Sequence, residues 1–389
     1  MKTSTRCVQL GRGHDAYGAI VPPIYQTATF EQLTATEFGE YDYTRSGNPT
    51  RTLLKQQLAD LEDAAYASCF ASGMAALTAL TRIVKTGEEI IAGDDLYGGT
   101  VRLLDRLASH QNISVRYVDT TDGDELRKAV TDRTRLVLIE TPSNPLFRIS
   151  NIRELASIAR EAGAYLAVDN SMLSPVFQRP LNFGADIVVH SATKFLCGHS
   201  DVTAGALITN DPTLHKQLSF QQNAEGAGLS PFESWLLLRG LKTLALRVER
   251  QNASAEKVAR FLQARPEVSK VFYPGLRDHP GREIHQKQSH GNGAVVSFTT
   301  GDDKLSSEIV ESTKLFKVAV SFGSLGSTIS LPCRMSHASI PSALRDRLAP
   351  PSDLVRLSVG IEDSDDLLED LERAFELSLR QRQLEEVYG

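Results

Sequence analysis

The stretch Ala185–Lys194 reads Ala-Asp-Ile-Val-Val-His-Ser-Ala-Thr-Lys. Its apolar run, Ile187–Val189, is typical of a strand that is buried on both faces of a sheet. The run leads into two hydroxyl side chains and Lys194, so the strand would deliver polar groups to a pocket at its carboxyl end. A lone lysine after a strand is usually solvated. Lys194 is therefore a candidate Schiff-base nucleophile only if the rest of the chain supplies a matching site.

Short apolar segments on either side of this stretch alternate with helical patterns. The segments predict seven strands, at 66–70, 89–92, 114–118, 136–140, 165–169, 186–190 and 205–209. Amphipathic helices are predicted from Thr50 and over 152–161. This alternation predicts an α/β fold with a mostly parallel seven-stranded sheet and helices on both faces. Ligands of such sheets bind beyond the carboxyl ends of the strands.

The chain divides into three expected parts. Residues 1–46 lack a clear period but contain many aromatic side chains, which predicts an extended arm that packs on a partner subunit. Residues 47–242 form the large domain. Residues 243–389 are expected to form a smaller carboxy-terminal α/β domain, with helices at 244–262, 306–313 and 367–379 and strands at 271–273, 294–298, 319–322 and 355–359.

Composition excludes several classes of protein. The 389 residues contain 42 basic and 48 acidic side chains, a net charge of -6, and no basic run, so we expect no nucleic-acid partner. The four cysteines form no C-x-x-C pair, which argues against a zinc cage or a disulfide framework and fits a reducing cytoplasm. No stretch approaches the roughly 18 apolar residues of a membrane span, and we expect no leader peptide.

Polar residues gather where the predicted strands end. Ser72, Gly73 and Met74 follow the first strand and open a helix, whose first amides could bind a phosphate. Ser191 and Thr193 would add hydroxyls to the same site. Each group alone has a plain structural interpretation, since Ser72 could simply cap the helix. Together they could surround one dianion.

Three further side chains are candidates for binding a charged ligand. Asp169 ends an apolar strand, where it is either a helix cap or the buried partner of a cation such as a protonated pyridine nitrogen. Tyr97 follows the second strand and would either pack in the core or stack on a cofactor. Arg356 lies inside an apolar strand, which is costly unless it binds an anion, and a bidentate contact with a carboxylate is a natural use.

Two rival interpretations are less favourable. Residues 191–194 match the S-x-x-K motif of serine acyl-transfer enzymes, and 85–87 read K-T-G. In those enzymes the K-T-G follows the S-x-x-K and an S-D-N lies between them, whereas here the order is reversed and S-D-N is missing. His190, Cys197 and His199 are too few for a metal site, so structural roles are expected.

A phosphate cup, a partner for a ring nitrogen, a lysine for an aldehyde and an arginine for a carboxylate describe pyridoxal phosphate holding an amino acid. Over essentially its full length, the chain resembles the Cys/Met-metabolism family of pyridoxal phosphate enzymes, of fold type I. The shared motifs are YDYTRSGNPT at 41–50, ASGMAA at 71–76, DDLYGG at 94–99 and residues 191–201. Within the family, residues 321–324 and 331–341 look most like the plant-type cystathionine β-lyases.

The resemblance implies an aspartate-aminotransferase-like fold and specific roles. The catalytic residues would be Lys194, which would hold the cofactor covalently and move a proton, and Tyr97, which would stack on the ring. Asp169 would pair with the ring nitrogen. The remaining cofactor-binding residues would be Gly73, Met74, Asn144, Ser191 and Thr193, with Tyr43 and Arg45 contributed by a neighbouring subunit. The substrate-binding residues would be Arg356, Ser321 and Tyr43. No metal is implied.

The activity implied is α,β-elimination of cystathionine to homocysteine, pyruvate and ammonia, a step of methionine biosynthesis. A γ-lyase or γ-synthase is the nearest alternative. Many γ-specific relatives have a glutamate where this chain has Gly326, and methionine γ-lyases have a cysteine in place of Gly99, which disfavours both. A non-catalytic cofactor-binding regulator is the alternative from another class. The resemblance also implies a homotetramer in the cytoplasm, or in the plastid stroma for a processed plant-type form.

Overall fold

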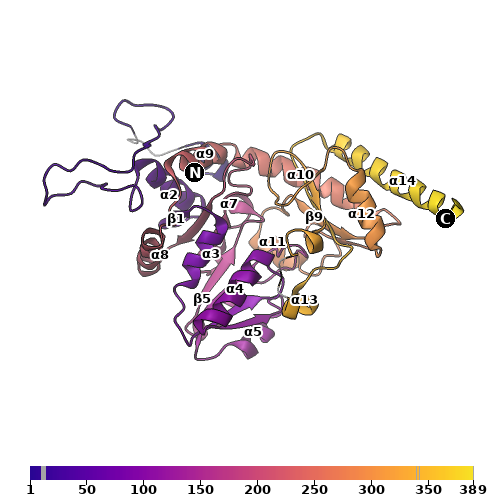
Figure 1. Cartoon of the computed structure of the whole chain (residues 1–389), viewed down its shortest axis with the longest axis horizontal. Coiled ribbons are helices and arrows are strands. Elements are labelled where there is room, and N and C mark those ends of the chain that lie inside the picture. The colour runs from indigo at the N-terminus through magenta and orange to yellow at the C-terminus, as the bar shows by residue number, and fades with distance from the viewer. Residues whose placement is uncertain (10–14, 339, 341, 389) are drawn as a thin grey trace.

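The computed structural model describes residues 1–9, 15–338, 340 and 342–388, and contains two β-sheets flanked by helices (Figure 1). The larger sheet has seven strands in the order β1-β7-β6-β5-β4-β2-β3. They are β1 (Tyr66–Phe70), β2 (Glu89–Gly93), β3 (Ser114–Val118), β4 (Thr134–Glu140), β5 (Tyr165–Asp169), β6 (Ile187–Ser191) and β7 (Gly205–Thr209).

The larger sheet is mostly parallel, as predicted. Strands β3, β2, β4, β5 and β6 pair in parallel, whereas β7 pairs antiparallel with both β6 and β1. All seven predicted strands form, with ends that differ by at most two residues from the expected ones. The carboxyl ends of β4, β5 and β6 therefore lie side by side, and Glu140 is directly opposite Asp169 in the register.

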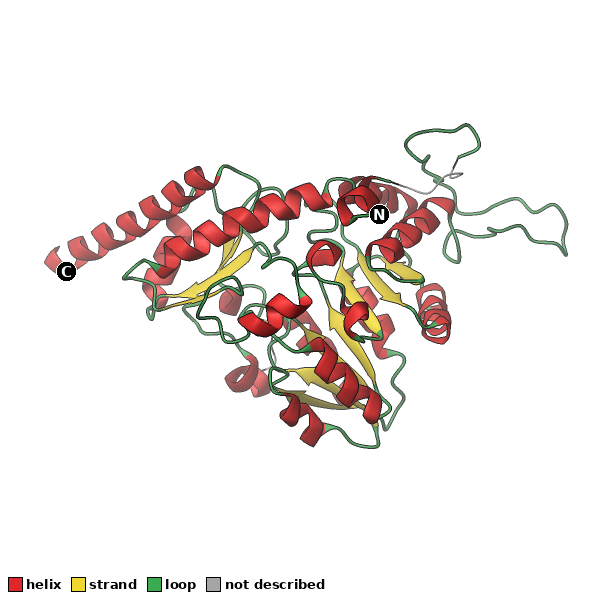
Figure 2. Cartoon of the chain, turned by 180° about the vertical axis from the view of Figure 1, so that it is seen from behind, coloured by secondary structure: helices red, strands yellow, loops and turns green. Residues whose placement is uncertain are grey.

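Helices cover both faces of the larger sheet (Figure 2). They are α1 (Thr3–Val8), α2 (Pro49–Leu61), α3 (Gly73–Thr81), α4 (Gly98–Gln111), α5 (Gly123–Ala129), α6 (Ile152–Glu161), α7 (Ser174–Phe177), η1 (Pro180–Phe183), α8 (Pro212–Ala224) and α9 (Pro231–Leu241). Alternate residues of β6 show the layering. Ile187 and Val189 pack in the same cluster as α3, α4 and α8, whereas Val188 packs on the other face with α2 and α9.

The second sheet has five strands in the order β10-β11-β12-β9-β8. They are β8 (Lys270–Phe272), β9 (Val295–Thr299), β10 (Lys317–Val318), β11 (Thr328–Ser330) and β12 (Val355–Ser358). The accompanying helices are α10 (Leu244–Gln263), α11 (Arg282–Gln288), α12 (Asp303–Ser312), η2 (Pro332–Arg334), α13 (Ser342–Leu348) and α14 (Ser364–Tyr388). This smaller sheet with its helices confirms the expected carboxy-terminal α/β region.

One predicted strand is wrong. Residues 319–322 form a loop, and the strands in this region are β10, which ends just before it, and β11, which was not predicted. Ser321 has a φ of 83°, in the left-handed region, which interrupts an extended backbone. Phe322 packs against Phe195 with ring centroids 5.9 Å apart. The loop therefore carries side chains toward the larger domain instead of extending the small sheet.

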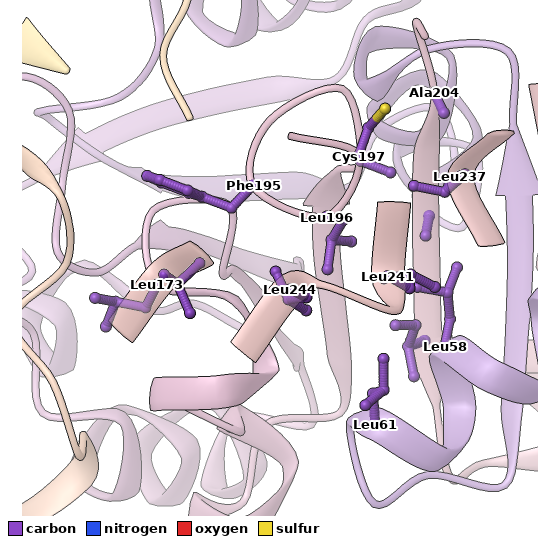
Figure 3. Close-up of a cluster of buried hydrophobic side chains, with 14 of the residues drawn as sticks. Leu58, Leu61, Leu173, Phe195, Leu196, Cys197, Ala204, Leu237, Leu241 and Leu244 are labelled. Atoms are coloured by element: carbon purple, nitrogen blue, oxygen red, sulfur yellow. The ribbon is translucent and has the colours of Figure 1, made fainter. Parts of the chain in front are cut away.

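The chain immediately after Lys194 is anchored in a buried cluster (Figure 3). Leu196 lies among Leu58 of α2, Leu241 of α9 and Leu244 of α10, all of which are buried. Burial of each such side chain contributes roughly 2 kcal/mol to folding. The cluster also holds the backbone that carries Lys194, because the lysine is only two residues away.

A buried hydrogen bond connects the end of α2 to the strand that leads to Lys194. Nε2 of His190 lies 2.6 Å from Oε1 of Glu62, and Nδ2 of Asn170 donates to the same oxygen at 3.1 Å. The structural role expected for His190 is therefore confirmed. Within the described part of the chain, no group of acidic, histidine and cysteine residues is arranged to hold a metal ion.

Much of the arm between residues 15 and 46 projects away from the body of the molecule (Figure 1). Helix α1 does not, because its Cys7 is buried in the same cluster as Leu54 of α2, so the extended arm expected over residues 1–46 is wrong for this helix. Tyr17 and Leu33 are each 98% exposed and Phe38 is 69% exposed. The arm is attached at its base, where Nε1 of Trp235 donates to the carbonyl of Pro22 at 3.0 Å. In the part of the chain that the structure describes, no helix combines the length and the apolar character needed to cross a bilayer.

Candidate active site

A pocket of about 470 Å³ lies at the carboxyl ends of β4, β5 and β6, where loops from the smaller sheet meet the larger one. All the predicted site residues line this pocket except Tyr43 and Arg45. A second cavity, of about 610 Å³, is lined by Arg148, Lys270 and His279 and contains none of them. The predicted residues, which are spread over almost 300 positions, therefore converge on one site.

The amino terminus of α3 and the residues after β6 form one wall of the pocket. Ser72 caps α3 by accepting a hydrogen bond from the amide of Ala75 at 3.0 Å. A Cβ at Gly73 would lie only 3.0 Å from Cβ and Oγ of Ser191, so glycine is needed for this close approach. The first amides of a helix have no partner within it and carry a partial positive charge. The wall therefore suits an anionic group such as a phosphate.

The side chain of Thr193 connects two segments of this wall. Its Oγ1 donates to the carbonyl of Ala204 at 3.2 Å and accepts from the Ala204 amide at 2.9 Å. The hydroxyl thereby ties the chain after β6 to the start of β7. A phosphate only accepts hydrogen bonds, so the Oγ1 hydrogen of Thr193 would turn from the Ala204 carbonyl to the ligand when a phosphate binds.

Asp169 lies at the end of β5 on the pocket floor. Its Oδ1 accepts a hydrogen bond from the amide of Ser171 at 2.9 Å. Burial raises the pKa of Asp169, and the Ser171 hydrogen bonds and the charges of His190 and Lys194 oppose that shift. A cation bound in the pocket would stabilise the ionised carboxylate further. This arrangement fits the protonated ring nitrogen of pyridoxal phosphate.

Lys194 follows β6 by three residues and reaches into the pocket. Its Nζ donates to Oγ of Ser321 and lies 5.0 Å from the centre of the Phe322 ring. Burial, and then the positive charge of Arg356, lower the pKa of Lys194 to about 8, while Asp169 acts in the opposite direction. A much larger fraction of this amine is neutral at physiological pH than of an exposed lysine. The neutral form is the one that attacks an aldehyde.

Arg356 enters the pocket from β12 and is only 2% exposed. Its Nη1 donates to Oδ1 of Asn144 at 2.8 Å, and its Nη2 donates to the carbonyl of Ser321 at 3.0 Å. Among the described residues, no carboxylate lies within ion-pair distance of this guanidinium. Burial lowers its pKa to about 10, which leaves it charged at physiological pH. A buried guanidinium without a carboxylate partner is suited to an anionic ligand.

Tyr97 precedes α4 and is 39% exposed on the pocket wall. Its amide donates to Oε2 of Glu140 at 3.2 Å. A Cβ at Gly99 would lie 2.4 Å from Cε1 of Tyr97, so the ring can take this position only because residue 99 is glycine. The ring is thus available to stack on a planar ligand.

Tyr43 and Arg45 lie away from this pocket, at the base of the arm. Nε of Arg45 donates to Oδ1 of Asn223 at 3.0 Å, and the guanidinium lies 5.4 Å from the centre of the Tyr43 ring. Tyr43 is 43% exposed. Their expected contribution to the pocket of a neighbouring subunit stays a prediction.

Several pocket residues were missed in the sequence. Glu140 ends the apolar strand β4 in the same way that Asp169 ends β5, so the same pattern could have identified it. Burial and the neighbouring Asp169 and Asp95 raise the pKa of Glu140 well above its usual range. Met335 and Ser336 also line the pocket, from the loop after η2. Nothing in the local pattern of that loop identifies them as pocket residues.

Comparisons with known proteins agree with this geometry. A model of the Cys/Met metabolism PLP-dependent enzyme family matches residues 4–376. The chloroplastic cystathionine beta-lyase of Arabidopsis thaliana is 53% identical over 96% of this chain and 80% of its own length. The cystathionine beta-lyase of Neurospora crassa is 51% identical over 92% of this chain and 79% of its own length.

Solved structures show the same fold. A cystathionine gamma synthase from Xanthomonas oryzae pv. oryzae, in complex with aminoacrylate and cysteine, superimposes with a TM-score of 0.95 and is 39% identical. The match covers 98% of this chain and 99% of the other. This protein is therefore an enzyme of fold type I, and the chain belongs to the Cys/Met metabolism PLP-dependent enzyme family.

Proposed function

We propose that this protein is a cystathionine β-lyase. It would convert L-cystathionine and water to homocysteine, pyruvate and ammonia, as a step in methionine biosynthesis. Relatives from Arabidopsis thaliana, Mimosa pudica and Neurospora crassa, each more than 50% identical to the chain over the matched region, are all named cystathionine beta-lyase. The observation that carries the proposal is one pocket in which an amine of lowered pKa, Lys194, lies beside a buried cation, Arg356.

The cofactor roles proposed for the pocket residues follow from their chemistry. The α3 amides at Gly73 and Met74 and the hydroxyls of Ser191 and Thr193 would bind the phosphate. Asp169 would hold the ring nitrogen in its protonated form, and Tyr97 would lie against the ring. The side-chain amide of Asn144, which already accepts from Arg356, would lie near the phenolic oxygen.

The substrate would be oriented through its carboxylate. Arg356 presents two N–H groups in a plane, which match the two oxygens of an α-carboxylate. It would be joined by Ser321, whose hydroxyl lies at Nζ of Lys194. Bound in this way, the amino acid would have its Cα close to the lysine.

Lys194 would carry the proton transfers. When bound, pyridoxal phosphate supplies an electron sink that stabilises negative charge at Cα. Lys194 Nζ, neutral at a pH near its lowered pKa, would accept the Cα proton and hold it close to the departing sulfur. The thiolate would then leave from Cβ as homocysteine.

The proposed assembly is a homotetramer of two dimers with shared active sites. The exposed apolar side chains of the arm support a partner there, because large apolar side chains seldom remain in water at such density. In this assembly, the partner subunit's Tyr43 and Arg45 would complete the phosphate site, and Tyr43 would also contact substrate. We propose a cytoplasmic location, or the plastid stroma for a processed plant-type form.

The keto acid formed from cystathionine tests the proposal. The expected product is pyruvate, released together with homocysteine. If the purified protein instead forms 2-oxobutyrate, the sulfur is lost from Cγ and the β-lyase assignment is wrong. That outcome would favour the γ-lyase or γ-synthase alternative, which the likeness to the Xanthomonas oryzae structure keeps open.

A further inference from the structure

His337 lies beside the candidate active site, in the loop between η2 and α13, and is 3% exposed. Its amide donates to the carbonyl of Pro332 at 2.9 Å, so the backbone that leads to His337 is held in a turn. A Cβ at Gly98 would lie 2.8 Å from the carbonyl oxygen of Ser336 and 3.1 Å from Cα of His337. The loop is therefore seated directly on the first residue of α4, next to Tyr97.

Both ring nitrogens of His337 face a polar partner. Nε2 lies 3.3 Å from the carbonyl oxygen of Asn144, which can only accept, so Nε2 carries the hydrogen. Nδ1 lies 2.9 Å from Oγ of Ser336. Burial and then the charge of Arg356 lower the pKa of His337 to about 4, so the ring is neutral and Nδ1 accepts from the hydroxyl. These two bonds are consistent with a hydrogen on Nε2, and they connect the ring to Asn144 and Ser336, which both line the pocket.

The edge of the same ring meets Tyr97. The two ring centroids are 6.5 Å apart and the planes are inclined by 84°, the edge-to-face arrangement that aromatic pairs prefer. The ring of Tyr97 also packs closely on Gly99, where a Cβ would lie 2.4 Å from its Cε1. Asn144 is likewise held from two directions, because its side chain accepts from Arg356 and its carbonyl accepts from His337.

We propose that His337 is a positioning residue, which holds Tyr97, Asn144 and Ser336 in the one arrangement that lets the pocket orient its cofactor. The inference rests on the proposed function, because it assumes that Tyr97 and Asn144 contact pyridoxal phosphate. His337 itself transfers no proton in this scheme.

Two substitutions separate the contributions of the ring and of its nitrogens. His337→Phe keeps an aromatic edge against Tyr97 and loses both hydrogen bonds, whereas His337→Gln keeps a donor for Asn144 and loses the ring. His110→Gln, at an exposed histidine of α4, is the matched control. Equilibrium dialysis with pyridoxal phosphate measures the affinity for the cofactor. The circular dichroism of the cofactor's visible absorption band, divided by the amount of cofactor bound, reports its orientation.

We expect His337→Phe to weaken cofactor binding by about tenfold, because the net loss of one to two hydrogen bonds has about this effect on a dissociation constant. The same variant should reduce the circular dichroism of the bound cofactor. His337→Gln should recover most of the affinity and little of the dichroism. Both variants should lower kcat more than they raise KM. If both variants match His110→Gln in affinity and dichroism, or if they change only the unfolding midpoint, the proposal is wrong. If His337→Phe does not fold, cofactor affinity and cofactor dichroism are measured for His337→Gln and Ser336→Ala instead, and the same outcomes support or contradict the proposal.

The wild-type protein separates this inference from the proposed function. If it binds pyridoxal phosphate and forms no pyruvate from cystathionine, the β-lyase assignment fails, while the dialysis and dichroism measurements on His337 still apply. If it binds no pyridoxal phosphate at all, both proposals are wrong.

Discussion

At the scale of single residues, the proposed function depends on a half-buried lysine and a buried arginine that share one pocket. Lys194 and Arg356 flank the ring of Phe322, at 5.0 and 5.5 Å from its centre. Burial, and then the positive charge of Arg356, lower the pKa of Lys194, so the lysine loses affinity for its proton. The same contact that orients a substrate carboxylate therefore also prepares the lysine to react.

Replacement of Lys194 tests its assignment directly. We expect Lys194→Ala to abolish covalent cofactor binding and nearly all turnover, because no other amine lines the pocket among the described residues. Borohydride reduction followed by peptide mass spectrometry should locate the cofactor on Lys194 in the wild type, and nowhere in the variant. Lys216→Ala, at an exposed position of α8, is the control. A cofactor attached to a different lysine would show that the assignment is wrong.

The lowered pKa of Lys194 predicts a pH dependence. In cofactor-free protein, the rate of covalent capture of pyridoxal phosphate should rise about tenfold per pH unit as the amine loses its proton. The rise should level off above about pH 8, the pKa of Lys194. Arg356→Gln removes a positive charge that favours the neutral amine, so the plateau should move to higher pH. A plateau that stays in place in this variant would contradict the proposed coupling.

At the scale of elements, the turn after Lys194 is positioned by another buried arginine, Arg247 of α10. Nη1 of Arg247 donates to the carbonyl of Phe195 at 2.8 Å, and Nη2 donates to the carbonyl of Gly240 at 2.9 Å. A Cβ at Gly240 would lie 2.4 Å from the carbonyl oxygen of Cys197. Helices α9 and α10 are thus packed onto the backbone that carries the reactive lysine.

Substitution of Arg247 should loosen this turn. Arg247→Met keeps the apolar stem of the side chain but removes the donor to the carbonyl of Phe195 and one of the donors to the carbonyl of Gly240. We expect the free energy of unfolding to fall by about 2–4 kcal/mol. Denaturant titration measures the change, with Arg239→Met, at an exposed position of α9, as the control. Equal unfolding midpoints in the two variants would show that these hydrogen bonds contribute little.

At the scale of the whole molecule, the arm is the part whose exposure is hardest to explain in a single chain. Its large apolar side chains lie far from the core, and its polar pair, Tyr43 and Arg45, lies outside the chain's own pocket. Both facts are consistent with an assembly in which each arm reaches a second copy. The domain boundaries at 46/47 and 242/243 likewise stay predictions.

Mixed oligomers test the shared site. Arg45→Ala and Lys194→Ala should each be nearly inactive, but in a heterodimer of the two, one of the two sites would contain both native residues. Co-expression of the variants in equal amounts should therefore restore roughly a quarter of wild-type activity, the share expected for random dimers. Pyruvate formation by the purified mixture measures it. Activity that stays at the level of the separate variants would indicate that the site is built from one chain.

The sequence by itself determined the α/β class, all seven strands of the larger sheet and the residues that end β5 and β6. These features follow from local patterns. Apolar runs between helical segments indicate buried parallel strands, and a polar residue at the end of such a run is expected to lie at the pocket. The family motifs added the roles of residues such as Asn144 and Ser321. Local pattern failed at 319–322, where the left-handed backbone of Ser321 interrupts the strand.

Only the tertiary structure decided which distant residues support the site. Glu140 faces Asp169 because two strands pair in register, and His337 meets Tyr97 because a loop of the smaller domain is seated on α4. The end of an apolar strand can point to Glu140 as a pocket residue, but neither contact itself can be inferred from the neighbouring sequence, because each joins residues far apart in the chain. The lowered pKa of Lys194 could not be predicted from the sequence either. It depends on burial and on the distance to Arg356, and both are established only when the two sheets pack together.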